Sequence, residues 1–173
     1  MTVYLDHNAA APLRPAAAAA VAAAMGLIGN PSSVHDHGRR ARRLIEDART
    51  AVALSAGARP ADVVFTGSGT EACQLALRIG GRTRLLASAS EHAAVLQAPA
   101  GARLLPLNGD GILDLAALEA ALGADARDAI VAVMLANNET GTVQPVRKIA
   151  EIVHRAGGAL VVDAAQAYGK LAL

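Results

Sequence analysis

A glycine-rich turn is the first segment whose residue types suit ligand binding. An apolar run, residues 63–66, leads into Gly67-Ser68-Gly69-Thr70-Glu71, and a helical pattern follows. Free N–H groups at a helix start, the helix dipole and glycines that admit close approach all favour an anion. Thr70 can add a hydroxyl donor. The turn therefore predicts a phosphate site, with glycines that merely turn a strand into a helix as the alternative.

The same turn satisfies a dinucleotide fingerprint. The pattern is Gly67-x-Gly69-x-x-Ala72, and Glu91 follows at about the distance of a ribose-binding acid. No Gly-Lys-Ser/Thr sequence follows the turn, so it is not a Walker A loop. The turn alone leaves a dinucleotide and a smaller phosphate ligand both open.

Short β-branched segments alternate with helical patterns along most of the chain. The predicted strands are residues 63–66, 84–87, 103–107, 130–135 and 159–162. The predicted helices are residues 15–25, 38–56, 69–79, 91–97, 115–122 and 146–156. This alternation predicts a three-layer α/β/α fold with a mostly parallel sheet. We expect residues 1–14 to form an N-terminal arm and residues 15–173 to form part of one large domain.

Composition excludes several classes of partner. The 173 residues carry a formal net charge of +1, which gives no field strong enough to imply nucleic acid. A run of arginines near residue 40 fits a solvated helix face better, with Arg42 meeting Glu46 and Arg43 meeting Asp47. The alanine-rich run at residues 16–25 is too short to cross a membrane. With Cys73 as the only cysteine, we expect a cytoplasmic protein without an intramolecular disulfide.

Six short segments recur in an order typical of one enzyme family. They are YLDHNAAAP at 4–12, NPSSVH at 30–35, GSGTE at 67–71, EHAAV at 91–95, NNETG at 137–141 and DAAQ at 163–166. Together they resemble the class V aminotransferase-fold family of pyridoxal-phosphate (PLP) enzymes, and within it the cysteine desulfurases. The resemblance covers essentially the whole chain and implies PLP as the cofactor and the large PLP-binding domain as the fold.

The resemblance implies roles for the residues that would hold PLP. Gly69 and Thr70 would bind the phosphate, and Gln166 would reach the ring hydroxyl. Asp163 ends a predicted strand and would keep the pyridine nitrogen protonated, which makes the ring a good electron sink. An aspartate that only caps the next turn is the alternative for Asp163.

Two further residues are expected near the reacting atoms. The resemblance places His92 against the cofactor ring, where it would move protons to and from the substrate. A surface or helix-capping histidine is the alternative. Asn138 is implied near the ring oxygen and the substrate carboxylate, although two asparagines before Glu-Thr-Gly also suit an ordinary turn.

The implied reaction converts L-cysteine to L-alanine and leaves a persulfide on the enzyme, with the sulfur passing to an acceptor or scaffold protein for iron–sulfur or other thio-cofactor assembly. A homodimer is implied, and no metal, nucleic acid or membrane partner is expected. A selenocysteine lyase, an aminotransferase, a dinucleotide-binding module and a non-catalytic half that only dimerises are the alternatives.

Two groups that the implied reaction needs have no match in the sequence. The only lysines are Lys148, on a predicted helix, and Lys170, where the family has a structural Gly-Lys pair. The Schiff-base lysine is expected roughly twenty residues past Leu173. Cys73 lies in the first turns of a helix and is expected to be a small buried residue, not the persulfide cysteine. We therefore expect a truncated or split enzyme that is inactive by itself.

Overall fold

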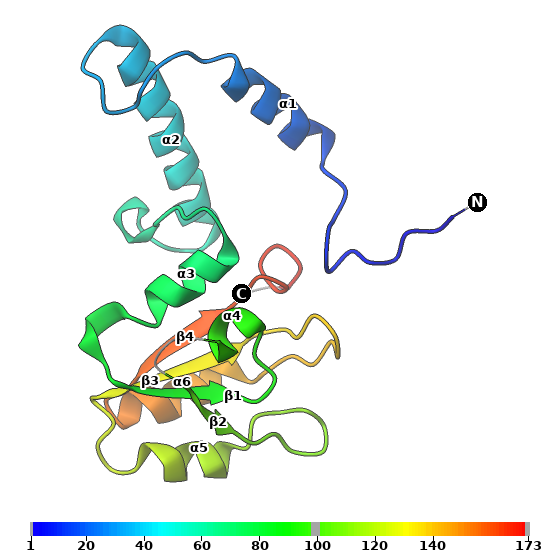
Figure 1. Cartoon of the computed structure of the whole chain (residues 1–173), viewed down its shortest axis with the longest axis vertical. Coiled ribbons are helices and arrows are strands. Elements are labelled where there is room, and N and C mark those ends of the chain that lie inside the picture. The colour runs from blue at the N-terminus through cyan, green and yellow to red at the C-terminus, as the bar shows by residue number, and fades with distance from the viewer. Residues whose placement is uncertain (1, 98–100, 172–173) are drawn as a thin grey trace. The chain divides into compact units, whose positions relative to one another are not determined.

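The computed structural model describes residues 2–97 and 101–171 of the chain (Figure 1). The described residues form two compact units that divide after Phe65. The boundary between the units follows Phe65, whereas the sequence predicted an arm that ends at residue 14. That arm remains a prediction.

The first unit consists of helix α1 (Pro15–Met25), helix α2 (Asp36–Ser55) and the short 3-10 helix η1 (Pro60–Asp62). Proline at the first position of α1 fits a helix start, because its missing N–H would have no helical partner there. The His35 ring caps α2 by accepting a hydrogen bond from the Gly38 N–H at 3.3 Å. A Cβ at Gly38 would lie 2.3 Å from the Ser33 carbonyl oxygen, so this close approach requires glycine.

Helix α2 is long and strongly charged. It carries ion pairs between Arg39 and Asp36 and between Arg49 and Glu46. Glu46 is thus paired one turn further along the helix and not with Arg42, the partner predicted from sequence. Among the described residues, no helix combines the length and the apolar character needed to span a membrane.

The second unit contains a four-stranded parallel sheet in the order β2-β1-β3-β4. The strands are β1 (Arg84–Ser88), β2 (Arg103–Leu105), β3 (Ala129–Met134) and β4 (Ala159–Asp163). The helices are α3 (Gly69–Ala76), the 3-10 helix η2 (Ile79–Gly81), α4 (Ala93–Leu96), α5 (Leu115–Leu122) and α6 (Val146–Arg155).

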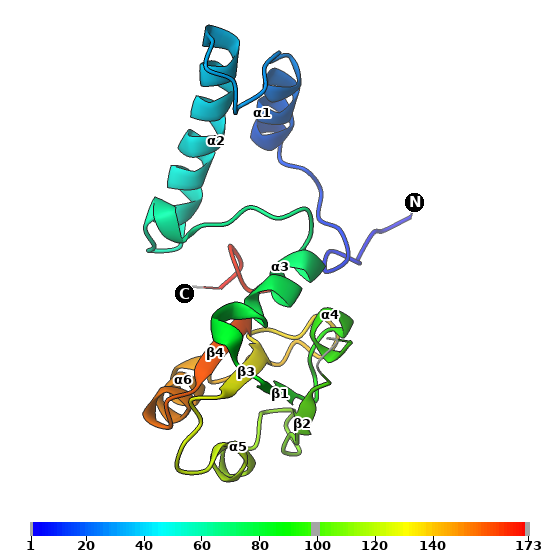
Figure 2. The ribbon, with the colours of Figure 1, turned by 60° about the vertical axis from the view of Figure 1, so that its left-hand side comes forward.

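Successive residues of β3 point to opposite faces of the sheet and enter two separate cores. Val131 and Val133 pack on the face that α5 and α6 cover, in a cluster with Leu118 and Ile149. Ile130 and Ala132 pack on the other face, with Leu77, which follows α3, and Val95 of α4. Figure 2 shows the two helical layers on either side of the sheet. The predicted three-layer α/β/α fold is confirmed.

The predicted strand at residues 63–66 is wrong. In the described structure this segment pairs with none of the four strands, and Val64 and Phe65 are largely exposed. Arg49 of α2 engages it instead. The guanidinium donates to the Val63 carbonyl at 2.6 Å and lies 5.0 Å from the centre of the Phe65 ring. A segment of high β-propensity forms a strand only where a neighbouring strand pairs with its backbone N–H and C=O groups.

Candidate active site

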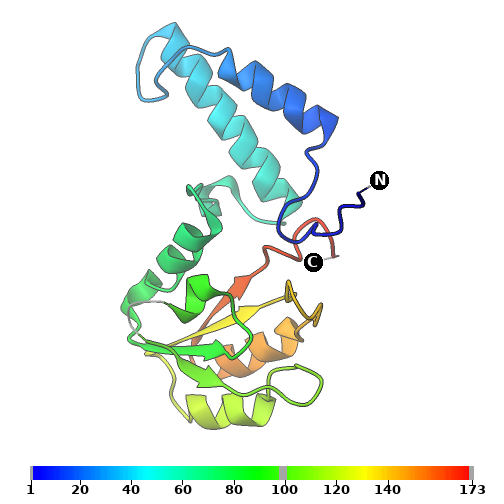
Figure 3. The same ribbon diagram turned by 45° about the vertical axis from the view of Figure 1, so that its right-hand side comes forward.

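All four strands run in the same direction, so the loops that follow them leave the sheet at one edge (Figure 3). Open parallel sheets bind ligands at this carboxyl edge. Asp163 ends β4, His92 follows β1, and Asn138 follows β3. The topology therefore brings these three predicted site residues to one edge.

The glycine-rich turn forms the capped start of α3. The Ser68 hydroxyl accepts a hydrogen bond from the Glu71 N–H at 3.2 Å, and the Glu71 carboxylate accepts one from the Gly67 N–H at 2.7 Å. Gly69 and Thr70, in the first turn of α3, are exposed. A Cβ on Gly69 would meet no atom within 4 Å. Packing does not explain this glycine, and its backbone is open to a close ligand.

The Asp163 carboxylate lies between its own loop and α3. One oxygen accepts a hydrogen bond from the Ala165 N–H at 2.9 Å, which is the turn-capping role considered from sequence. The other oxygen lies 4.0 Å from the Cys73 sulfur on α3. Cys73 is three residues after Thr70, about 4.5 Å along the helix axis. The glycine-rich turn and the Asp163 carboxylate therefore lie on the same face of the sheet. The turn begins α3, and the carboxylate approaches α3 about one turn later, at Cys73.

Cys73 is held as a thiol. Its side chain is half-buried, and its pKa is raised by burial first and then by the negative charges of Asp163 and Glu91. The thiolate is the nucleophilic form of cysteine, so these surroundings oppose nucleophilic chemistry. They agree with the interpretation of Cys73 as a packing residue.

His92 begins helix α4 and is exposed. Its Nδ1 accepts a hydrogen bond from the Ala94 N–H at 3.1 Å, so the ring caps the helix, as the alternative interpretation expected. A neutral ring that accepts through Nδ1 carries its proton on Nε2. Capping thus fixes the ring and its tautomer, and leaves Nε2–H as the donor for a neighbour.

The two asparagines after β3, Asn137 and Asn138, have different surroundings. The Asn137 side chain donates to the Ser90 carbonyl at 3.0 Å, which ties the loop after β3 to the loop before His92. Its oxygen accepts from the Glu139 and Thr140 N–H groups, each at 2.9 Å. Asn138 is half-buried in the same loop. Sequence reasoning missed Asn137, whose turn-forming tendency was the available signal.

Glu91 is the other residue that sequence reasoning misjudged. It retains only 6% exposure, and one carboxyl oxygen accepts a hydrogen bond from the Met134 N–H at 2.5 Å. Burial raises its pKa to about 7, against the lowering effect of the Met134 bond and with a further increase from Asp163. A buried carboxyl bound to the end of β3 is not available to a ribose. The ribose-binding role considered for Glu91 is therefore wrong.

Gln166 and the two lysines complete the predicted set. Gln166 is half-buried in the turn after β4, and its oxygen accepts a hydrogen bond from the Lys170 ammonium at 2.6 Å. Lys148 is exposed on α6, which covers the face of the sheet opposite to α3. Lys148 and the Asp163 carboxylate, which approaches α3, therefore lie on opposite faces of the sheet.

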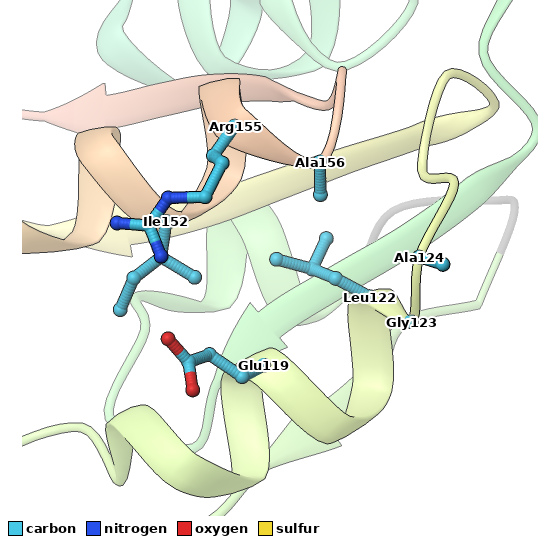
Figure 4. A pocket seen from close by; sticks show the side chains of 7 residues that line it. All are labelled: Glu119, Leu122, Gly123, Ala124, Ile152, Arg155 and Ala156. Carbon is cyan, nitrogen blue, oxygen red and sulfur yellow. The ribbon is translucent and has the colours of Figure 1, made fainter.

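A surface pocket of about 310 Å³ lies elsewhere, between α5 and α6 (Figure 4). Its lining residues are Glu119, Leu122, Gly123, Ala124, Ile152, Arg155 and Ala156. These residues surround the ends of both helices, shortly before β3 and β4 begin. The pocket is thus at the amino edge of the sheet, opposite to the edge that holds Asp163.

Comparison with known proteins identifies the family of the chain. The aminotransferase class-V family model matches residues 3–173, and the chain belongs to that family. Among curated relatives, an IscS-like cysteine desulfurase of Mycobacterium tuberculosis is 41% identical over 187 residues, covering 98% of this chain and 48% of the relative. A cysteine desulfurase of Cereibacter sphaeroides is 42% identical over 184 residues, covering 98% and 47%. The chain spans about half the length of these relatives.

Solved structures agree with the fold. A NifS-like protein from Rickettsia africae superposes with a TM-score of 0.91 at 30% identity, covering all of this chain and 50% of that one. SspA in complex with cysteine has a TM-score of 0.83 at 26% identity, with 98% and 52% coverage. PLP is the cofactor of this family. The exposed start of α3 suits its phosphate, and a carboxylate on the same face suits its ring nitrogen, so the residues present fit the group.

Proposed function

We propose that this chain carries the cofactor-binding residues of a PLP-dependent cysteine desulfurase, which converts L-cysteine to L-alanine and an enzyme persulfide. The observation that carries the proposal is the approach of the Asp163 carboxylate to α3, 4.0 Å from the sulfur of Cys73. The cysteine desulfurases among its relatives support the choice of substrate.

Bound PLP would supply an electron sink for the bonds at the substrate Cα. Asp163 keeps that sink effective, because a carboxylate beside the ring nitrogen holds its proton. The N–H groups at the start of α3, with the Thr70 hydroxyl, bind the phosphate. In this proposal Gln166 donates to the ring hydroxyl through its amide nitrogen, while its oxygen accepts from Lys170.

His92 and Asn138 act on the substrate side. His92 would lie against the ring and donate a hydrogen bond through Nε2–H, because its Nδ1 accepts the Ala94 N–H. It would transfer a proton only after Nδ1 releases the Ala94 N–H, because the capped neutral ring has no free lone pair. Asn138 orients the substrate carboxylate from the loop after β3. The bond between Asn137 and Ser90 holds the two loops together, so these two side chains keep a fixed spacing.

The 173 residues offer no good candidate for the Schiff-base lysine or the persulfide cysteine. Lys148 lies on the opposite layer, Lys170 bonds to Gln166, and Cys73 is held as a thiol. We propose that residues outside this sequence supply both groups. The isolated chain should form no alanine from cysteine. In the active enzyme, a cytoplasmic homodimer, sulfur would pass to an acceptor or scaffold protein for iron–sulfur or other thio-cofactor assembly.

The test is PLP binding to the chain, followed by the circular dichroism that the protein induces in the cofactor absorption band. We expect saturable induced dichroism, weaker in Thr70→Val. Pyridoxal, which has no phosphate, should bind the native chain much less tightly than PLP. Ser55→Ala removes a hydroxyl from the other unit and should leave the signal unchanged.

Adducts of PLP with surface lysines need their own control. Borohydride reduction followed by mass spectrometry reports any covalent adduct at Lys148 or Lys170. Dichroism that survives in the Lys148→Arg and Lys170→Arg variants supports the proposal. Dichroism that disappears in those variants, or that pyridoxal reproduces at equal concentration, contradicts it.

A further inference from the structure

Glu91 has no part in the binding scheme above, yet its surroundings are unusual for a carboxyl group. Glu91 retains only 6% exposure, in a loop that directly precedes His92. In the described part of the chain, its second oxygen, Oε2, has no hydrogen-bond partner. A buried carboxylate with an unpaired oxygen is costly, whereas a carboxylic acid carries no charge at that oxygen.

The contacts of Glu91 join two strands at the carboxyl edge. Oε1 accepts the Met134 N–H at 2.5 Å, and Met134 is aligned with Asp163 in the register of β3 and β4. A second link, from Asn137 to the Ser90 carbonyl, joins the same two loops. The Glu91 side chain therefore fixes the start of the His92 loop beside the end of β3, next to the strand end that carries Asp163.

Titratable neighbours offer no positive charge to pair with Glu91. The titratable groups near Glu91 are the Cys73 thiol of α3 and the Asp163 carboxylate of β4. His92, the next residue, directs its Nδ1 to the Ala94 N–H. No lysine or arginine forms an ion pair with Glu91 among the described residues. A second negative charge beside Asp163 would go uncompensated.

We infer that Glu91 keeps its proton in the folded protein at mildly acidic pH, where an exposed glutamate is ionised, and acts as a positioning residue that links the His92 loop to the end of β3. In its protonated form Glu91 adds no second negative charge beside Asp163. The part of the inference that concerns catalysis by His92 rests on the proposed function. The charge state of Glu91 and the tie to Met134 do not.

The first test is a pH titration of the glutamate side chains by NMR, in cofactor-free protein labelled with ¹³C at the glutamate carboxyl carbons. One resonance should titrate with a pKa of about 7 and be absent from Glu91→Gln. Glu119→Gln removes an exposed glutamate and should leave that resonance in place. A Glu91 resonance that titrates in the ordinary range of a glutamate overturns the inference.

The second test measures the tie itself by amide hydrogen exchange below the titration of Glu91. Glu91→Gln keeps an acceptor oxygen and should preserve protection of the Met134 amide. Glu91→Ala should speed exchange at Met134, and at Ala94 through the loosened His92 cap, by about fivefold or more. Unchanged exchange at both amides in the alanine variant would refute the positioning role.

The two proposals fail separately, because the titration and exchange measurements need no cofactor. An ordinary titration of Glu91 together with saturable PLP binding would reject the present inference and leave the proposed function standing. A titration at about pH 7 without PLP binding would do the reverse.

Discussion

Replacing Glu91 by glutamine should stabilise the protein, and the gain should grow with pH. The pKa of Glu91 rises from its ordinary value of 4.5 to about 7 on folding, mainly because the side chain is buried. The folded state thus binds a proton between these pH values that the unfolded state has released. The native protein loses stability as the pH rises from 4.5 to about 7. Glutamine, which cannot ionise, removes this loss.

The size of the effect follows from the two pKa values. One pH unit of difference corresponds to about 1.4 kcal/mol, so the full cost of ionising Glu91 in the folded state is about 3 kcal/mol. Part of this cost is already present at about pH 5. Between about pH 5 and about pH 8 the glutamine variant should gain about 2 to 3 kcal/mol over the native protein. A gain of this size is a large fraction of the stability of an ordinary domain.

The assay is urea unfolding of both proteins across this pH range, monitored by far-ultraviolet circular dichroism because the chain has no tryptophan. Taking the difference between variant and native protein removes the contribution of other titrating groups. Glu119→Gln, an exposed control, should give a small and pH-independent difference. A Glu91→Gln difference that stays constant with pH, or that falls as the pH rises, would refute the reasoning.

Three further predictions concern packing, capping and thiol chemistry. Leu118→Ala, at a fully buried core position, should lower the free energy of unfolding by about 2 to 5 kcal/mol, whereas Leu54→Ala, at 76% exposure, should cost far less in the same urea assay. Ser68→Ala removes the cap of α3 and should cost about 1 kcal/mol, measured by unfolding of the second unit. Cys73 should react with iodoacetamide more slowly than free cysteine, and Asp163→Asn should speed the reaction because it removes a charge that raises the thiol pKa.

Local signals in the sequence predicted most of the elements that build the site. Pro145 and Gly157 bound the predicted helix at residues 146–156, and α6 lies at Val146–Arg155. These residues act through their own backbone geometry, so no distant contact is needed to predict their effect. The strand ending at Asp163 was predictable for a similar reason, because a continuous apolar run leads up to it.

Features that depend on distant contacts were not predictable. Residues 63–66 have the composition of a strand, but the described structure provides them with no partner strand. Glu91 sits next to His92 in a polar loop, and nothing local indicates that its carboxyl group turns inward to Met134. The structural role of Asn137 was equally unpredictable, because only the folded sheet brings the Ser90 carbonyl within reach of its side chain.

The proposed role of Asp163 is to act on the ring nitrogen of a cofactor whose phosphate would lie at the start of α3. The direct measurement is the ¹⁵N chemical shift of PLP labelled at the pyridine nitrogen and bound to the chain. We expect the shift of a protonated nitrogen in the native protein and that of a neutral nitrogen in Asp163→Asn. A neutral pyridine nitrogen in the native protein, or a protonated one that persists in Asp163→Asn, would contradict this role.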